Sequence, residues 1–81
     1  MTPEQRAMAK ALGYVTMCPG LPVKRFARDM AWRAGNVPSH PLTDAQARYL
    51  SKVVVRFRRQ IDPAVVELAR ADIAAREAQA A

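Results

Sequence analysis

Residues 43–61 read TDAQARYLSKVVVRFRRQI, and this stretch decides the fold that the sequence predicts. Its apolar residues recur at steps of three and four, as they do on one side of an α-helix. Three consecutive valines at 53–55 favour a strand by residue type, but they lie inside the helical pattern. The side that faces the core consists of Ala47, Leu50, Val53, Val54, Phe57 and Ile61. The stretch therefore predicts one long helix that packs against other helices.

Two capping boxes mark helix starts. Thr2 precedes Pro3, which suits the first position of a helix, and Gln5 can bond back to the capping residue. Residues 43–46 (TDAQ) repeat this box at the start of the long helix. In such a box, side chains satisfy backbone N–H groups that have no partner within the helix. We therefore expect helices to begin near residues 3 and 43.

Prolines mark the two other starts. Asp62 is a cap in front of Pro63, and Pro22 opens a segment that reaches the stop signal Gly35-Asn36. The first helix is expected to continue through Gly13, because the apolar period runs on beyond it. The sequence thus predicts an all-α fold, a small single-domain bundle over 1–81 with about four helices, roughly 3–16, 22–34, 43–61 and 63–78. Its expected core contains Phe26, Met30, Leu50, Val54, Phe57, Val66 and Ile73.

The composition indicates a basic protein that binds an anionic partner. The 81 residues include thirteen Lys and Arg against seven Asp and Glu, which gives a formal charge of +6. Nucleic acid, an acidic protein surface or an anionic membrane would suit this charge. A membrane is the weakest of the three, because no exposed apolar band flanks the basic residues. A domain this small buries roughly 60% of its unfolded surface, so we expect marginal stability.

The sequence favours a cytoplasmic location. A single cysteine, Cys18, cannot form an intramolecular disulfide, which suggests a reducing compartment. No apolar run approaches the roughly 20 residues that cross a bilayer, and no signal-peptide pattern is seen at the N-terminus.

A stripe of basic residues is the main candidate for a binding site. Arg48, Lys52, Arg56 and Arg59 follow one another at steps of four, four and three, which places them on one helical face. That face lies almost opposite the apolar side. No acid follows Asp44 in this stretch, so we expect that the stripe is not neutralised within its own helix. The stripe is either a contact surface for a polyanion or an ordinary solvated face.

Residues 22–34 give a second candidate surface with Lys24, Arg25, Arg28 and Trp32. Trp32 lies in line with the two arginines and away from the expected core. A tryptophan beside arginines is typical of binding hot spots, and it can also stack on a base. The alternative is burial of Trp32 under the first or fourth helix. Tyr49, at the edge of the stripe, either belongs to an interface or packs against the loop 35–42.

Catalytic and metal-binding patterns are lacking in the sequence. Cys18 and His40 cannot alone form a zinc site, which needs four ligands. No carboxylate pair suits acid–base catalysis, and no glycine-rich loop suits a phosphate. We therefore expect no enzyme activity, no metal and no cofactor. Eight residues separate the second and third helices, too many for a helix-turn-helix motif, so backbone contacts with little sequence discrimination are expected.

The segments 24–30 (KRFARDM) and 42–61 (LTDAQARYLSKVVVRFRRQI) resemble short uncharacterised helical proteins of phages and other mobile elements. The resemblance covers about half of the chain and carries no catalytic motif. It implies a protein that helps replication, or that binds and blocks a host machine, in the cytoplasm of a bacterial cell or a phage-infected host. Anti-CRISPR proteins are similar in size and often occupy the contact surface of an effector complex.

Three hypotheses for function follow. In the first, a non-catalytic module binds the phosphate backbone of nucleic acid through the basic face of residues 43–61, assisted by residues 22–34. In the second, a phage-type inhibitor or adaptor docks the same face on an acidic protein surface. In the third, a homodimer hides Trp32 and uses the stripe only for solubility.

Overall fold

Two helices begin at the capping boxes that the sequence predicts. The computed structural model describes residues 1–17 and 20–80, and its first helix, α1, spans Pro3–Leu12. The Gln5 amide donates to Thr2 Oγ1 over 3.1 Å, and the Thr2 amide donates to Gln5 Oε1 over 3.0 Å. α3, Asp44–Arg56, begins with the same pair of bonds from residues 43 and 46. Both predicted boxes are confirmed.

The all-α prediction is confirmed, and the remaining helices also begin at prolines. α2 spans Pro22–Asn36, and α4 spans Pro63–Ala80. At the start of α4 the Ala64 amide donates to Asp62 Oδ1 over 2.8 Å, so Asp62 is the predicted cap. A short 3₁₀ helix, η1, covers Arg58–Gln60 between α3 and α4.

The ends of α1 and α2 differ from the prediction. α1 ends at Leu12 and not near 16, because the amides of residues 13–15 bond three residues back, which tightens the last turn and turns the chain away. α2 passes through Gly35, around which a side chain would find open space, and ends at Asn36. The Val37 amide closes it on the Arg33 carbonyl over 2.8 Å.

The predicted single helix 43–61 is in fact α3 followed by η1. α3 stops at Arg56, because Phe57 leaves the helical backbone region with φ −104° and ψ 25°. The Gln60 side chain then holds the chain after α1: it accepts from the Thr16 amide over 2.8 Å and donates to the Thr16 carbonyl over 3.0 Å. The approach to Pro63 also disfavours helix, because the residue before a proline prefers an extended backbone.

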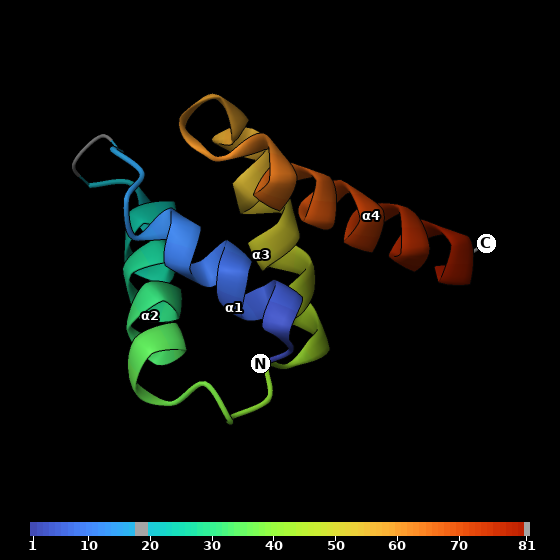
Figure 1. Ribbon diagram of the computed structural model, residues 1–81, viewed down its shortest axis with the longest axis horizontal. Helices are drawn as coiled ribbons and strands as arrows, with labels where there is room; N and C mark the ends of the chain where they lie inside the picture. The colour runs from blue at the N-terminus through green and yellow to red at the C-terminus, as the bar shows by residue number, and fades with distance from the viewer. Residues whose placement is uncertain (18–19, 81) are drawn as a thin grey trace.

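α1 lies across the other three helices and contacts each of them (Figure 1). α2 packs on α1, and α3 packs on α1 and on α4. The start of α2 and the turn that follows α3 lie at the same end of the molecule in Figure 1. The N-terminus and the loop 37–43 lie at the opposite end, where the Met1 amine is 2.8 Å from the Pro38 and His40 carbonyl oxygens.

The core is built from small and medium-sized side chains of all four helices. Met8, Leu12, Met30, Leu50 and Val54 are its large members, and alanines of each helix fill the space between them. Four of the seven predicted core residues are buried: Met30, Leu50, Val54 and Val66. Phe26, Phe57 and Ile73 are only half-buried, because the centre is occupied by Met8, Ala9 and Leu12 of α1. The core therefore places both phenylalanines at its margin.

The last turns of α4 project past the rest of the bundle (Figure 1). α4 has 18 residues and many alanines, and its helix continues beyond the predicted end at 78 to Ala80. Across 1–17 and 20–80, no helix is long and apolar enough to cross a membrane.

Candidate nucleic-acid interface

Two of the four residues of the predicted basic stripe lie on α3 as exposed cations without an ion pair to any described residue. Lys52 and Arg56 are exposed and, within the described part of the chain, neither forms an ion pair with a carboxylate. The Arg56 guanidinium lies 5.4 Å from the centre of the Phe57 ring, close enough for a cation–π contact. These two cations are available for a partner.

The prediction that the stripe is not neutralised within its own helix is wrong at Arg48. Its Nη2 lies 3.0 Å from Asp44 Oδ2, one turn earlier on α3. An acid four residues before a base is the favourable order on a helix, and an acid in the first turn also complements the helix dipole. Arg48 is therefore an ion-paired member of the stripe.

Arg59 does not lie on the α3 face. The predicted step of three from Arg56 assumed a continuous helix, but Phe57 ends α3 and Arg59 belongs to η1. Arg59 is exposed, and the turn after α3 lies at the end of the molecule where α2 begins (Figure 1). Arg59 therefore adds positive charge to that end without extending the helical stripe.

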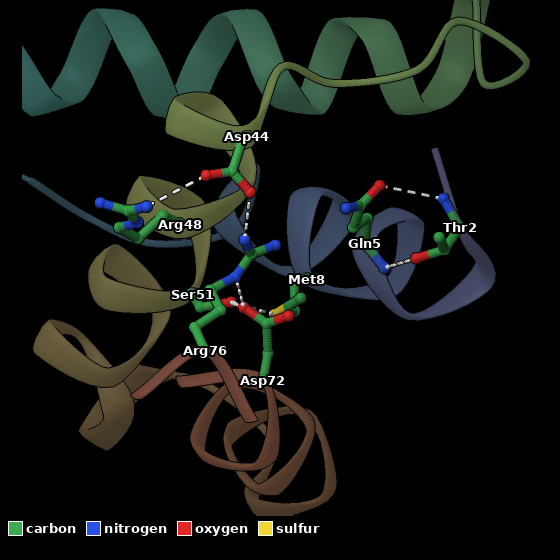
Figure 2. A network of polar contacts seen from close by, with 8 residues as sticks. All are labelled: Thr2, Gln5, Met8, Asp44, Arg48, Ser51, Asp72 and Arg76. Carbon is green, nitrogen blue, oxygen red and sulfur yellow. Dashed lines mark hydrogen bonds and ion pairs between the residues drawn. The ribbon is translucent and has the colours of Figure 1, made fainter. Parts of the chain in front are cut away.

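A polar network joins α3 to α4 and was not predicted (Figure 2). Arg76 of α4 donates to Asp44 Oδ1 over 2.7 Å and to Asp72 Oδ2 over 2.8 Å. Asp72 also accepts from the hydroxyl of Ser51, which is 0% exposed, over 2.7 Å. We call Asp44, Arg48, Ser51, Asp72 and Arg76 the α3–α4 network. Its two acids and two bases cancel, so the network itself carries no net charge.

The network shifts the protonation of its two members on α4. Partial burial acts to raise the pKa of Asp72, but hydrogen bonds from Arg76 and Ser51, with the charge of Arg76, outweigh it and lower the pKa. The hydrogen bond to Asp72, followed by the one to Asp44, raises the pKa of Arg76. Both groups therefore stay charged at neutral pH and act as structural ties between the helices.

The basic residues predicted on α2 lie in its first two turns. Arg25 and Arg28 are exposed and Lys24 is half-buried; no ion pair links any of them to a carboxylate in the described ranges. The first turn of α2 has no acid, and Leu21 provides no side-chain cap, so the helix dipole adds to the positive potential. Asp29, the nearest acid on α2, is engaged by Arg33 over 3.2 Å.

Trp32 faces solvent. The sequence left open whether Trp32 points outward or is covered by the first or fourth helix, and the structure leaves 59% of the residue exposed. Covering by another helix is therefore wrong. The backbone carbonyl of Trp32 accepts a hydrogen bond from Asn36 Nδ2 over 2.8 Å. This bond belongs to the last turn of α2 and does not involve the indole ring.

Tyr14 is the functional candidate that the sequence reading missed. It is 89% exposed, more than any other large apolar residue that the structure describes. Continuation of the first helix to 16 would have placed it on a helix, but α1 ends at Leu12 and Tyr14 stands in the turn that follows. The glycine just after Leu12, a common helix stop, was the available signal.

Tyr49 contacts an aromatic ring of α2. Its ring meets that of Phe26 edge to face, with centroids 4.6 Å apart and an angle of 74° between the planes. It remains 42% exposed, on the same side of α3 as Lys52 and Arg56. The sequence left two roles open for Tyr49, an interface or packing on the loop 35–42. The contact with Phe26 is neither of these, because it links α2 to α3.

Metal ligands do not gather in the described parts of the chain. No group of three or more His, Cys, Asp or Glu side chains able to hold a metal ion is found within 1–17 and 20–80. His40 is exposed in the loop before α3, and Cys18 lies outside the described residues.

The start of α2 and the end of α3, which carry these basic residues, lie at the same end of the molecule (Figure 1), whereas Arg48 belongs to the neutral α3–α4 network. Comparison of the chain with protein-family models, with curated proteins and with solved structures finds no match in any of the three.

Proposed function

We propose that this protein is a non-catalytic module that binds the phosphate backbone of nucleic acid. Lys52 and Arg56 of α3 would contact phosphates, assisted by Lys24, Arg25 and Arg28 of α2. The observation that carries the proposal is that these five cations lack a carboxylate partner among the residues described, whereas Arg33, Arg48, Arg70 and Arg76 have one.

The position of these cations supports the proposal. Residues 20–28 and 45–61 contain no acid, and the start of α2 and the end of α3 lie at one end of the molecule (Figure 1). The acids that follow these two segments are both engaged: Asp29 pairs with Arg33, and Asp62 caps α4. Each phosphate that is neutralised releases counterions, so five contacts to a single strand would give a salt slope of up to about −3.5 in log K against log salt.

A titration with matched variants tests the proposal. Binding of labelled DNA and RNA, single-stranded and duplex, is measured by fluorescence anisotropy at several salt concentrations. We expect the double variant Lys52→Gln/Arg56→Gln to reduce the magnitude of the single-strand salt slope by about 1.4. Arg48→Gln removes the same kind of charge from the same helix, but the slope should change much less because Arg48 is paired with Asp44.

Two results would contradict the proposal. One is the absence of binding to all four nucleic acids at low salt. The other is binding whose affinity does not depend on salt, because phosphate contacts necessarily release counterions.

A second function is favoured by the exposed aromatic residues. Trp, Tyr and Arg dominate the energetics of protein interfaces, and all three are exposed on or beside α2. In this alternative the protein is an inhibitor or adaptor, of the kind that the resemblance to phage proteins implies, and it docks on an acidic surface. A pull-down from a nuclease-treated bacterial lysate would then retain one stoichiometric protein, and its loss on nuclease treatment would count against direct contact.

A further inference from the structure

The two most exposed large apolar residues of the described chain lie on neighbouring segments. Tyr14 follows Gly13, and Trp32 follows Ala31. Gly13 and Ala31 are in close contact, because a Cβ atom placed on Gly13 would lie 3.2 Å from the Ala31 Cβ. Standard backbone dimensions then hold the Cα atoms of Tyr14 and Trp32 within about 14 Å of each other.

Cationic residues of α2 lie near this aromatic pair. Arg28 and Lys24 line the same cavity of about 250 Å³ as Gly13 and Ala31. Arg28 is one turn before Trp32 on α2, and Arg25 is two turns before it on the same face. We call Tyr14, Lys24, Arg25, Arg28 and Trp32 the α2 patch. The one acid on α2, Asp29, lies three residues before Trp32 and is paired with Arg33 over 3.2 Å.

The exposure of two large aromatic rings near each other indicates a surface that contacts a ligand. Tryptophan is usually well buried, and water-exposed apolar surface forgoes about 25 cal/mol for each Å². Neither ring fills the core, since both side chains are largely in solvent. Flat aromatic surfaces beside unpaired cations suit a ligand that has flat faces and negative charges at short intervals, as a nucleic-acid strand does.

We propose that the α2 patch is a stacking platform for unpaired bases, and that the ligand of this protein is single-stranded nucleic acid. The inference rests on the proposed function. In a duplex, both faces of each base are covered by neighbouring bases, so exposed rings on a convex helical surface have nothing to stack on. In a single strand, bases can turn outward onto Trp32 and Tyr14 while Arg25 and Arg28 contact the flanking phosphates.

The single tryptophan gives a direct readout. Trp32 is the only tryptophan of the chain, so the intrinsic fluorescence reports on this residue alone. The full chain is titrated with an oligothymidylate of about 16 nucleotides, which covers the upper range of single-strand site sizes, and with a duplex of the same length. Stacking should quench the Trp32 emission with the single strand and leave it nearly unchanged with the duplex.

Variants separate stacking from general attraction. Trp32→Ala should weaken single-strand binding about tenfold or more and leave duplex binding nearly unchanged. Trp32→Phe should restore most of the lost affinity, because it keeps a flat ring. Tyr14→Ala should act in the same direction as Trp32→Ala, and Tyr49→Phe serves as control because its ring contact with Phe26 is kept. Circular dichroism confirms that each variant is folded.

The outcomes distinguish this inference from the proposed function. Salt-dependent binding that is equal for single strand and duplex, and insensitive to Trp32→Ala, would overturn the stacking platform and leave phosphate binding standing. Absence of binding to either nucleic acid would overturn both proposals. A protein partner captured by the wild type and lost with Trp32→Ala, in the absence of single-strand binding, would assign the patch to protein recognition and overturn the inference.

Discussion

The α3–α4 network and the α2 patch both contain arginines, but, among the described residues, those of the network are paired with carboxylates and those of the patch are not. In the network, Asp44 and Asp72 hold Arg48 and Arg76 by ion pairs of 2.7–3.0 Å, and the four charges cancel. In the α2 patch, Lys24, Arg25 and Arg28 have no such partner within the described residues, and two aromatic rings are exposed beside them.

The difference teaches that a count of basic residues does not locate a binding surface. The longest basic stripe in the sequence lies on the residues of α3 and η1, yet one of its members is neutralised and another has left the helix. The α2 segment has a less regular pattern, but its cations are free and its helix start adds positive potential. The position of the carboxylates decides which cations can reach a partner.

Loss of Asp72 should produce the largest effect, because it breaks the network from within. Asp72→Ala leaves the buried Ser51 hydroxyl without its strong acceptor and removes one of the two partners of Arg76. We expect the free energy of unfolding to fall by about 1–3 kcal/mol, measured by urea denaturation. The midpoint temperature of thermal unfolding, Tm, should fall by about 4–8 °C for each kcal/mol of stability lost.

A matched variant sharpens this result. Asp29→Ala breaks the exposed pair with Arg33 on α2, and it should cost at most about 0.5 kcal/mol. Adding Ser51→Ala to Asp72→Ala should recover part of the loss, because no buried hydroxyl then lacks a partner. Equal losses for Asp72→Ala and Asp29→Ala would refute the structural role of the network.

Acid should remove the contribution that Asp72 makes to the stability of the fold. The pKa of Asp72 is lower in the folded protein than in the unfolded chain, so its contribution to stability is present above the unfolded value of about 4. That contribution is lost as the pH falls through the lower, folded value. The stability difference between wild type and Asp72→Asn should therefore shrink below about pH 4, which urea denaturation over a pH series measures. A difference that stays constant through this range would contradict the assignment.

Binding should distinguish two arginines of the same helix. Arg28→Gln removes an unpaired cation of the α2 patch, and we expect the magnitude of the single-strand salt slope to fall by about 0.7. Arg33→Gln removes an arginine that Asp29 already engages, and the slope should change much less. Anisotropy titrations at several salt concentrations measure both, and a larger effect of Arg33→Gln would reverse the comparison.

The smallest expected effect is on stability at the aromatic pair. Trp32→Ala should change the free energy of unfolding by no more than about 0.5 kcal/mol, because the residue is 59% exposed and fills no part of the core. Urea denaturation measures the change. A loss comparable to that of Asp72→Ala would mean that Trp32 serves the fold and not a partner.

Local signals in the sequence predict the helix starts well. Each capping box and each helix-opening proline acts within four residues, so the bonds at Thr2, Thr43 and Asp62 follow from neighbours in the chain. The helix ends are harder to predict, because they depend on distant contacts. The segment after α3, for example, is bonded through Gln60 to Thr16, which lies 44 residues away in the sequence.

The candidate site could be predicted only in part, because some of its contacts are local in the sequence and others join distant segments. The pairing of Arg48 with Asp44 is local, and the order of acid and base at four residues was a usable signal. The partnership of Asp44 with Arg76 requires α4 to pack against α3, so no pattern within either segment contains it. The exposure of Tyr14 follows from the early end of α1, which the continuing apolar period concealed.

The most direct test is a chemical-shift titration of isotope-labelled protein with single-stranded oligothymidylate. We predict that the resonances of the Trp32 indole N–H and of the amides of Tyr14 and residues 24–32 shift, together with the amide resonances of Lys52 and Arg56. The amides of Asp72 and Arg76 should stay in place, because their charges are already neutralised. Shifts concentrated on α4, with residues 24–32 unmoved, would contradict the claim that the unpaired cations form the binding surface.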